Sequence, residues 1–424
     1  MKKFNKIKLW HFVLFVWIIL LIFRVDLLIQ TVELFWLTVI LIFKNFEFLS
    51  SHISFQLIDS LFALAVMFII PSLLLSSKFR NKFLGAEINF SRCFIILLVY
   101  SFFVPTLITR EHPDYQKNIS EIKLLSPLSN IYQIELSTKD SPTSDSIEEK
   151  FLLVKEKVLL KEFDENKIFV RSYSLKQNSY RFNSGGGSTD LSVDKVKSIK
   201  SELVLLGTDE FGRDIFSRLI FGERISIFIG MMAVIISLLL GLVLGYIAST
   251  GNAIINTVLN RLTDLFLSFP SIFLVILVLA LFGNNLLSVI VVLGFSGWMS
   301  LYKIVSSEVA SVKQKDFFIT AQKIGLSNSE LLAKEIIPVI IIPVTVNLVF
   351  QFSNVILAES SLSFLGLGAG SEYPSWGAMI EKGQEYISEA WWMIFIPGIV
   401  LVLTLLSFHN IAKEVNKFFN PKIS

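Results

Sequence analysis

Long apolar runs constrain the fold of this chain more than any other feature. Residues 225–246, 265–282 and 336–357 are each close to the ~20 residues that cross a bilayer as a helix. Only 17% of the 424 residues are charged and 53% are hydrophobic, so the chain lacks the polar surfaces that a soluble enzyme, a nucleic-acid binder or a secreted disulfide-rich module needs. The sequence therefore predicts an all-α polytopic membrane protein.

Cysteine and histidine usage argues against two kinds of site. Cys93 is the only cysteine, so we expect neither an intrachain disulfide nor a thiolate metal cluster. The four histidines are far apart and lack metal-ligand spacing, so we expect no metal site (His11, His52, His112 and His409). The Lys-rich N-terminus continues into apolar sequence without a small-residue cleavage site, which favours a retained membrane anchor.

Composition divides the chain into three zones. The first 109 residues hold apolar runs and a basic cluster at residues 78–82, which indicates the cytoplasmic side. The mixed-charge zone 110–218 is then expected outside, with short strands at 131–137 and 167–174. The third zone predicts spans near 225–247, 262–282, 285–305, 338–358 and 391–408, and we expect about eight spans in all.

The first 43 residues leave two arrangements open. Residues 58–75 must run inward to meet the basic cluster, so a cytoplasmic N-terminus needs an odd number of crossings before them. The run at 34–43 is short for a span, and it either lies along the membrane interface or joins residues 9–23 in one long tilted helix. We expect a single crossing there.

The loop 306–337 is expected in the cytoplasm as two short helices joined at a glycine. Gly325 ends the first helix as a C-terminal cap, and Ser327 or Asn328 caps a second helix that ends before Pro338. A partly apolar face and small side chains suit docking into a groove on a soluble partner. The candidate docking residues are Phe317, Thr320, Ala321, Gly325, Ser327 and Pro338.

This loop resembles the coupling loop of the permease subunits of ABC importers. In that family two alanines are followed by a glycine four residues on and then by a proline. Here Thr320 and Ala321 stand at the alanine positions, Gly325 at the glycine and Pro338 at the proline. The resemblance implies that the loop docks on an ATPase subunit. For the loop alone, an ordinary amphipathic connector is the alternative.

Other motifs occur in the same order as in the second permease subunit of the dipeptide, oligopeptide and nickel transporters. They are residues 207–218, 222–226, 261–270, 359–368, 374–377 and 391–398, and they cover about 200 residues. The resemblance implies a type I ABC importer permease core of about six helices, one near 93–109 and five in 222–408. Extra N-terminal membrane helices and a small β-containing extracytoplasmic insertion would be added to this core.

Two of these motifs hold candidate sites, each with a structural alternative. The first motif is expected to contact a partner outside the cell. Its structural alternative is a turn-rich start of a helix with capping aspartates (Gly207, Thr208, Asp209, Gly212, Arg213 and Asp214). The second motif is expected to line an outer gate. Its structural alternative is that small residues here only permit close helix packing (Glu359, Ser363, Gly366 and Gly368). Nearby, Arg261 and Asp264 are expected to form a local ion pair, and Pro270 to kink its helix.

The resemblance divides the chain into four segments. Residues 1–82 are additional N-terminal membrane segments, 83–128 hold the first core helix and the start of the outer loop, 129–206 are the β-rich extracytoplasmic insertion, and 207–424 are the permease core. The insertion either contacts a binding protein or shields the outer mouth.

The implied function is a permease that forms half of the translocation path for peptides or a similar small solute. The implied partners are a homologous permease in a heterodimer, two ATP-binding subunits at the cytoplasmic face, an extracytoplasmic solute-binding protein and the lipid bilayer, with no nucleic acid. The implied location is the prokaryotic cytoplasmic (inner) membrane, with a cytoplasmic C-terminus.

No catalytic residue and no cofactor are expected in this chain. The Gly-rich stretch 184–189 lacks the phosphate-loop pattern and is expected to be a flexible link, so ATP and Mg would bind to the partner ATPase subunits. A stand-alone ion-coupled transporter or channel is the alternative function. It is disfavoured because the predicted core spans carry almost no ionisable residues, with Lys303 and Glu359 at their ends.

Overall fold

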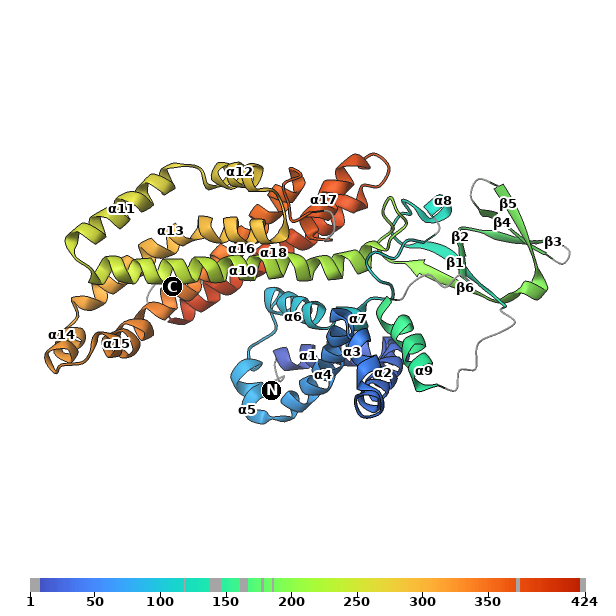
Figure 1. Ribbon diagram of the computed structural model, residues 1–424, viewed down its shortest axis with the longest axis horizontal. Coiled ribbons are helices and arrows are strands. Elements are labelled where there is room, and N and C mark those ends of the chain that lie inside the picture. Colours follow the sequence, from blue (N-terminus) through green and yellow to red (C-terminus); the bar gives the residue numbers. More distant parts are fainter. Residues whose placement is uncertain are drawn as a thin grey trace, which may run out of the picture. The chain divides into compact units, whose positions relative to one another are not determined.

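The computed structural model describes residues 8–117, 119–137, 146–160, 167–176, 179–184, 187–370 and 374–419. It divides into two compact units, unit 1 (Met1–Arg224 and Lys382–Ile396) and unit 2 (Ile225–Glu381 and Pro397–Ser424). Among the described residues, six helices are long and apolar enough to cross a membrane, or up to seven if one bent pair forms a single span. The predicted all-α polytopic membrane protein is confirmed (Figure 1).

The N-terminal part of unit 1 is helical. Its helices are α1 (Leu9–Phe23), α2 (Val25–Lys44), α3 (Phe46–His52), α4 (Phe55–Leu75), α5 (Ser77–Phe83), α6 (Phe90–Phe103) and α7 (Pro105–Ile108). The apolar run predicted near 93–109 is thus divided between α6 and α7. Pro105 begins α7, where a missing backbone N–H is tolerated, and the chain turns at Val104.

A helix of the insertion packs against these N-terminal helices. In α9 (Ile147–Lys155), Phe151 and Val154 are buried in one cluster with Leu37 of α2 and Leu57 of α4. The Lys155 ammonium group also donates to the carbonyl oxygen of His52 in α3 at 2.7 Å. The connection between α2 and α4 therefore lies beside the insertion, and the single crossing expected before it stays a prediction.

The rest of the insertion forms two small antiparallel sheets. Their orders are β2-β1-β6 and β3-β4-β5. Helix α8 (Ile119–Ile122) precedes the insertion, whose remaining elements are β1 (Ser129–Leu136), the π-helical turn η1 (Glu156–Leu160), β2 (Lys167–Val170), β3 (Tyr173–Lys176), β4 (Ser179–Ser184), β5 (Gly187–Ser192), the 3-10 turn η2 (Val193–Lys195) and β6 (Val196–Val204). Ile134, Val170 and Phe182 join the two sheets in one buried cluster. The predicted small β-containing insertion is confirmed.

Two sequence-based expectations for the insertion are corrected. The single strand predicted at 167–174 is two strands, β2 and β3, which belong to different sheets. The stretch 184–189 is not a flexible link between separate parts, because Ser184 pairs with Gly187 and the flanking strands form a hairpin. Residues 185 and 186 lie outside the described residues.

Unit 2 is helical. Its elements are α10 (Ile215–Thr250), α11 (Ala253–Ser268), α12 (Ser271–Phe282), α13 (Leu286–Lys313), α14 (Asp316–Lys323), α15 (Asn328–Glu330), the π-helical segment η3 (Leu331–Ile336), α16 (Ile337–Phe364), α17 (Trp376–Glu385) and α18 (Trp392–Phe419). Three of these helices, α10, α17 and α18, begin or end in unit 1. Gly241 and Gly245 of α10 face α13 so closely that an added Cβ would lie 2.7 Å from Leu301 and 2.8 Å from Val305. Small residues thus let these two helices pack at short distance.

The span predicted at 262–282 is broken. Helices α11 and α12 meet at an angle of 87°, with Phe269 and Pro270 between them (Figure 1, yellow). Proline lacks a backbone donor and disfavours helical conformation in the residue before it, so the helix stops instead of kinking slightly. The local ion pair predicted between Arg261 and Asp264 is also corrected, because Asp264 pairs with Lys303 of α13 at 2.8 Å.

Candidate functional site

The loop between α13 and α16 contains the two predicted helices and the predicted turn. Gly325 has a φ of +94°, a left-handed conformation that glycine adopts without a steric penalty. Its backbone N–H donates to the carbonyl oxygen of Gln322, and that of Leu326 reaches the carbonyl oxygen of Ala321 at 3.3 Å. These bonds satisfy carbonyl groups at the end of α14, as expected for a glycine cap.

The second helix begins at a capping box. Ser327 Oγ accepts a hydrogen bond from the backbone N–H of Glu330, and the Glu330 carboxylate accepts one from the backbone N–H of Ser327 at 3.0 Å. Hydrogen bonds from Ser327 and the nearby Lys334 ammonium group lower the pKa of Glu330 to about 2. Ser327, not Asn328, is therefore the capping residue, and its carboxylate partner is ionised at neutral pH.

The second helix does not end before Pro338, as the sequence predicted. The π-helical segment η3 leads into α16, and Pro338 lies in the first turn of α16. Pro338 has no backbone N–H to donate within this continuous helix, and it follows directly after the π-helical segment, where the regular α-helical hydrogen-bond pattern is interrupted. The loop is consequently continuous with the next membrane helix.

One face of α14 packs inside the protein. Phe318 and Ala321 are only 5% and 8% exposed, and they lie in a buried cluster with Val312 of α13, Leu331 of η3 and Ile340 of α16. Ala321 thus supports the loop from within and is not available for close approach by a partner. Phe318 was not singled out from the sequence, because two adjacent phenylalanines do not reveal which one points inward.

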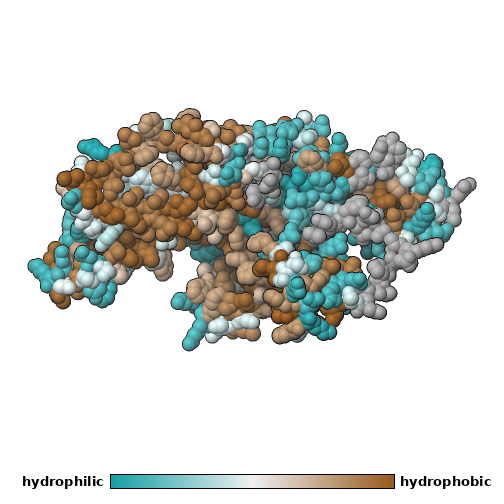
Figure 2. Space-filling view, viewed as in Figure 1, coloured by the Kyte–Doolittle hydropathy of each residue, from teal (hydrophilic) through white to brown (hydrophobic). Residues whose placement is uncertain are grey.

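An adjacent face of α14 is exposed. Phe317 is 45% exposed and Ile324 is 74% exposed, and the exposed Thr320 lies between them at helical spacing. We call Phe317, Thr320 and Ile324 the docking face. Figure 2 shows hydrophilic residues around α14 and α15, whereas apolar residues cover most of the neighbouring helices. An apolar face surrounded by polar residues is typical of a protein contact site.

A second predicted site, around Glu359, is fully buried in unit 2. Glu359 is 0% exposed, and its carboxylate accepts hydrogen bonds from the hydroxyls of Ser363 at 2.9 Å, Ser226 at 3.4 Å and Ser360 at 3.5 Å. Ser375 is a further hydrogen-bond partner. Helix α16 extends to Phe364, so Glu359 lies within the helix, whereas the sequence predicted it at the end of a span. We call these five residues the serine cage.

The glycines near the serine cage explain its tight packing. A Cβ added to Gly368 would lie 2.1 Å from Ser363 Oγ, so only glycine fits this position without a shift. Gly366 has a φ of +75° and ends the turn after α16. These contacts agree with the structural alternative of close packing, and a role in gating stays a prediction.

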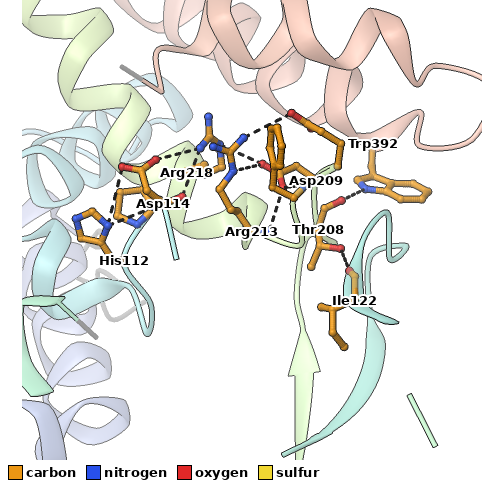
Figure 3. A network of polar contacts seen from close by, with 11 residues as sticks. His112, Asp114, Ile122, Thr208, Asp209, Arg213, Arg218 and Trp392 are labelled. Atoms are coloured by element: carbon orange, nitrogen blue, oxygen red, sulfur yellow. Dashed lines mark hydrogen bonds and ion pairs between the residues drawn. The ribbon is translucent and has the colours of Figure 1, made fainter. Parts of the chain in front are cut away.

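The predicted extracytoplasmic motif is a turn held by intrachain contacts, as Figure 3 shows. Thr208 is 0% exposed, and its hydroxyl donates to the carbonyl oxygen of Ile122 while its carbonyl oxygen accepts from Trp392 Nε1 at 3.3 Å. Asp209 is 4% exposed and bonds Arg213 Nε at 2.7 Å. Asp214 accepts from the backbone N–H of Ser217 at 2.9 Å and so caps α10.

The two glycines of this motif have the turn conformations that the structural alternative requires. Gly207 has a φ of +87° and Gly212 a φ of +71°. A Cβ on Gly207 would lie 2.5 Å from the carbonyl oxygen of Leu125. The buried members Gly207, Thr208 and Asp209 therefore stabilise the start of α10, and a partner contact at the partly exposed Arg213 and Asp214 stays a prediction.

Comparison with known families adds evidence of a different kind. The model of the family described as "Binding-protein-dependent transport system inner membrane component" matches residues 221–423. The chain is 33% identical over 217 residues to the dipeptide transport system permease protein DppC of Alkalihalophilus pseudofirmus, a match that covers 51% of this chain and 71% of the relative. It is 31% identical over 217 residues to the oligopeptide transport system permease protein OppC of Bacillus subtilis, with the same coverages.

Solved structures are more distant. The crystal structure of an amino acid ABC transporter matches with 16% identity and a TM-score of 0.39, over 48% of this chain and 94% of that chain. The methionine ABC transporter MetNI matches with 15% identity and a TM-score of 0.38, over 47% and 97%. The sequence matches alone confirm the predicted relationship to the dipeptide and oligopeptide branch. The chain belongs to the family of inner membrane permease components of binding-protein-dependent ABC importers.

Proposed function

We propose that this permease transports peptides or similar small solutes as one half of a heterodimer with a homologous permease, driven by ATP hydrolysis in separate subunits. The relatives named above are dipeptide and oligopeptide permeases, which supports peptides as the cargo. A solute-binding protein outside the cell delivers the cargo, and two ATP-binding subunits hold ATP and Mg. The chain lies in the prokaryotic inner membrane with its C-terminus in the cytoplasm, and it catalyses no reaction itself.

The docking face of α14 carries this proposal. Phe317, Thr320 and Ile324 form a narrow, mainly apolar surface that is exposed in the isolated chain. A short amphipathic helix of this kind suits a groove on a partner subunit. The exposed surface is small, so the contact depends on a few anchor side chains such as Phe317 and Ile324.

The inner face of α14 makes the loop a mechanical connector. The buried cluster that holds Phe318 and Ala321 also contains residues of α13 and α16, the helices before and after the loop. Because close-packed side chains resist deformation, a push on α14 moves both helices together. Movement of the ATPase subunits is thereby converted into re-orientation of the translocation path.

A charge placed on the docking face tests the proposal. Ile324→Glu introduces a carboxylate into the exposed apolar surface, and we expect ATP-dependent uptake and co-purification of the ATPase subunits to be lost. Gln322→Glu is the matched control, because Gln322 is also exposed on α14 but lies away from the docking face. Ala321 is unsuitable for this test, since a bulky residue there would disrupt the buried cluster.

The outcomes separate the candidate functions. Loss of uptake and of ATPase subunits in Ile324→Glu, with both retained in Gln322→Glu, supports coupling through the docking face. Full uptake by Ile324→Glu would refute it. Uptake by the chain without any ATPase subunit would instead favour the stand-alone transporter.

A further inference from the structure

Unit 1 contains a cavity of about 400 Å³ at the junction of four parts of the chain. Its walls come from the end of α1, the segment that follows α7, strand β6 and the start of α10. All of these parts lie outside residues 221–423, which the family model matches. The cavity is therefore built from residues outside the matched permease region.

The charged lining of the cavity is balanced. Three cationic and three acidic side chains contribute to it, namely Arg24, Arg110 and Lys117, and Glu111, Glu202 and Asp214. A site for a simple anion or a simple cation would show an excess of the opposite charge. A balanced lining instead suits a ligand that carries both a positive and a negative group.

Glu111 provides an unused acceptor in this lining. It is 9% exposed, and its Oε1 pairs with Lys117 Nζ at 2.6 Å. Its other carboxylate oxygen, Oε2, is buried and has no hydrogen-bond partner among the residues that the structure describes. Buried acceptors are nearly always satisfied, so this oxygen points to a donor that the isolated chain does not contain.

The apolar side of the cavity lies mainly on α1, an apolar helix of 15 residues. Ile19 and Phe23 of α1 line it together with Phe216 of α10. Phe23 is 73% exposed, so the apolar wall of the cavity continues onto the exposed surface of α1. Arg24 follows directly, and arginines at the ends of apolar helices are typical of the membrane interface.

We propose that this cavity binds the headgroup of a phospholipid with a primary ammonium group, as in phosphatidylethanolamine. The phosphate lies beside Arg24 and Arg110, the ammonium group donates to Glu111 Oε2 and is balanced by Glu202, and the acyl chains follow Phe23. Bound lipid then joins α1 to β6 and so stabilises the N-terminal helices against the insertion. This assignment does not depend on which solute the permease transports.

Native mass spectrometry of the full-length chain in detergent tests the assignment. The chain is titrated separately with phosphatidylethanolamine, phosphatidylcholine, phosphatidylglycerol and alanyl-alanine. We expect phosphatidylethanolamine to bind about tenfold more tightly than phosphatidylcholine, because a trimethylated ammonium group cannot donate to Glu111 Oε2. Phosphatidylglycerol is expected to bind more weakly still, since it offers no cation to the acidic side chains.

Two pairs of variants locate the site. Glu202→Gln and Arg110→Gln remove charges from the lining, and each is expected to weaken phosphatidylethanolamine binding about tenfold. Their controls, Glu135→Gln and Arg181→Gln, change charges on the insertion that do not line the cavity. Glu111 itself is avoided, because its loss would leave the buried Lys117 unpaired and endanger folding.

The result can overturn the proposal in three ways. Equal binding of phosphatidylethanolamine and phosphatidylcholine would exclude a donated ammonium hydrogen bond. Equal effects of the cavity variants and their controls would place the lipid elsewhere. Binding of alanyl-alanine that weakens in Glu202→Gln, without selective lipid binding, would show that the cavity takes a soluble zwitterion instead.

Discussion

Glu359 and Ser363 lie one turn apart in α16, and the serine hydroxyl donates a 2.9 Å hydrogen bond to the carboxylate. The serine cage supplies further hydroxyls from α10 and from the segment before α17. A carboxylate held only by neutral donors thus connects three segments of the permease core. Removing it leaves several buried hydroxyls without their acceptor, whereas removing one hydroxyl leaves the others in place.

We therefore predict that Glu359→Leu destabilises the chain by about 1–3 kcal/mol and lowers its unfolding temperature in detergent. Ser363→Ala removes one donor and has a smaller effect. Ser361→Ala is the control, because Ser361 is an exposed serine of the same helix that bonds only the carbonyl oxygen of Leu357. An unchanged unfolding temperature in Glu359→Leu would show that the serine cage has no structural role.

Gly377 gives a second test of the same region. An added Cβ would lie 2.6 Å from Ser363 Cβ and 2.7 Å from Ser360 Cα, so Gly377→Ala must displace α17 from α16. We expect a loss of about 1–3 kcal/mol, measured by thermal unfolding. Gly398→Ala is the control, since an added Cβ there meets nothing within 4 Å. A Gly377→Ala chain as stable as the control would mean that α17 moves without cost.

The long helices were predictable because a membrane span is recognised by its length and hydrophobicity alone. Their ends were not, since α10 and α16 continue past the apolar runs into residues such as Glu223 and Glu359. The break between α11 and α12 was also missed. Pro270 signals a distortion, but nothing local determines a bend of 87°.

Some features of the candidate sites could be predicted from nearby residues, and others depend on residues far apart in the sequence. The cap at Gly325 and the capping box at Ser327 depend on neighbours within a few residues, so the sequence indicates them directly. The serine cage depends on Ser226, which is 133 residues from Glu359. No local pattern distinguishes that serine from the others. The packing of α9 on α2 and α4 was likewise beyond sequence reasoning.

The capping box predicts a specific pH dependence of the coupling loop. The pKa of Glu330 is lowered to about 2 in the folded loop, and its ordinary value is about 4.3. Because the pKa is lowered in the folded loop, the ionised Glu330 stabilises the loop fully at a pH above its ordinary pKa. This stabilisation is lost as the pH falls toward 2. Hydrogen–deuterium exchange of residues 327–336 should therefore show protection that persists at pH 5 and decreases steadily below pH 4.

Variants of the capping box check this assignment. In Glu330→Gln the protection of the second helix is expected to be lower and to lose its dependence on pH below 5, because the capping carboxylate is gone. Ser327→Ala removes the cap and costs about 1 kcal/mol of local helix stability. Ser307→Ala, an exposed serine near the end of α13, is the control. A pH response that survives in Glu330→Gln must come from another group.

The final prediction concerns the interface between the two additions. Phe151 of α9 is 0% exposed and packs in the cluster formed with α2 and α4, whereas its neighbour Leu152 is 38% exposed. Phe151→Ala opens a cavity at this interface, and we expect a loss of about 3–5 kcal/mol together with faster proteolysis of the insertion. Leu152→Ala is the matched control, with little expected effect. Because the interface joins parts far apart in sequence, equal proteolysis of the two variants would mean that the insertion folds independently of the N-terminal helices, and its deletion would then leave α2 and α4 intact.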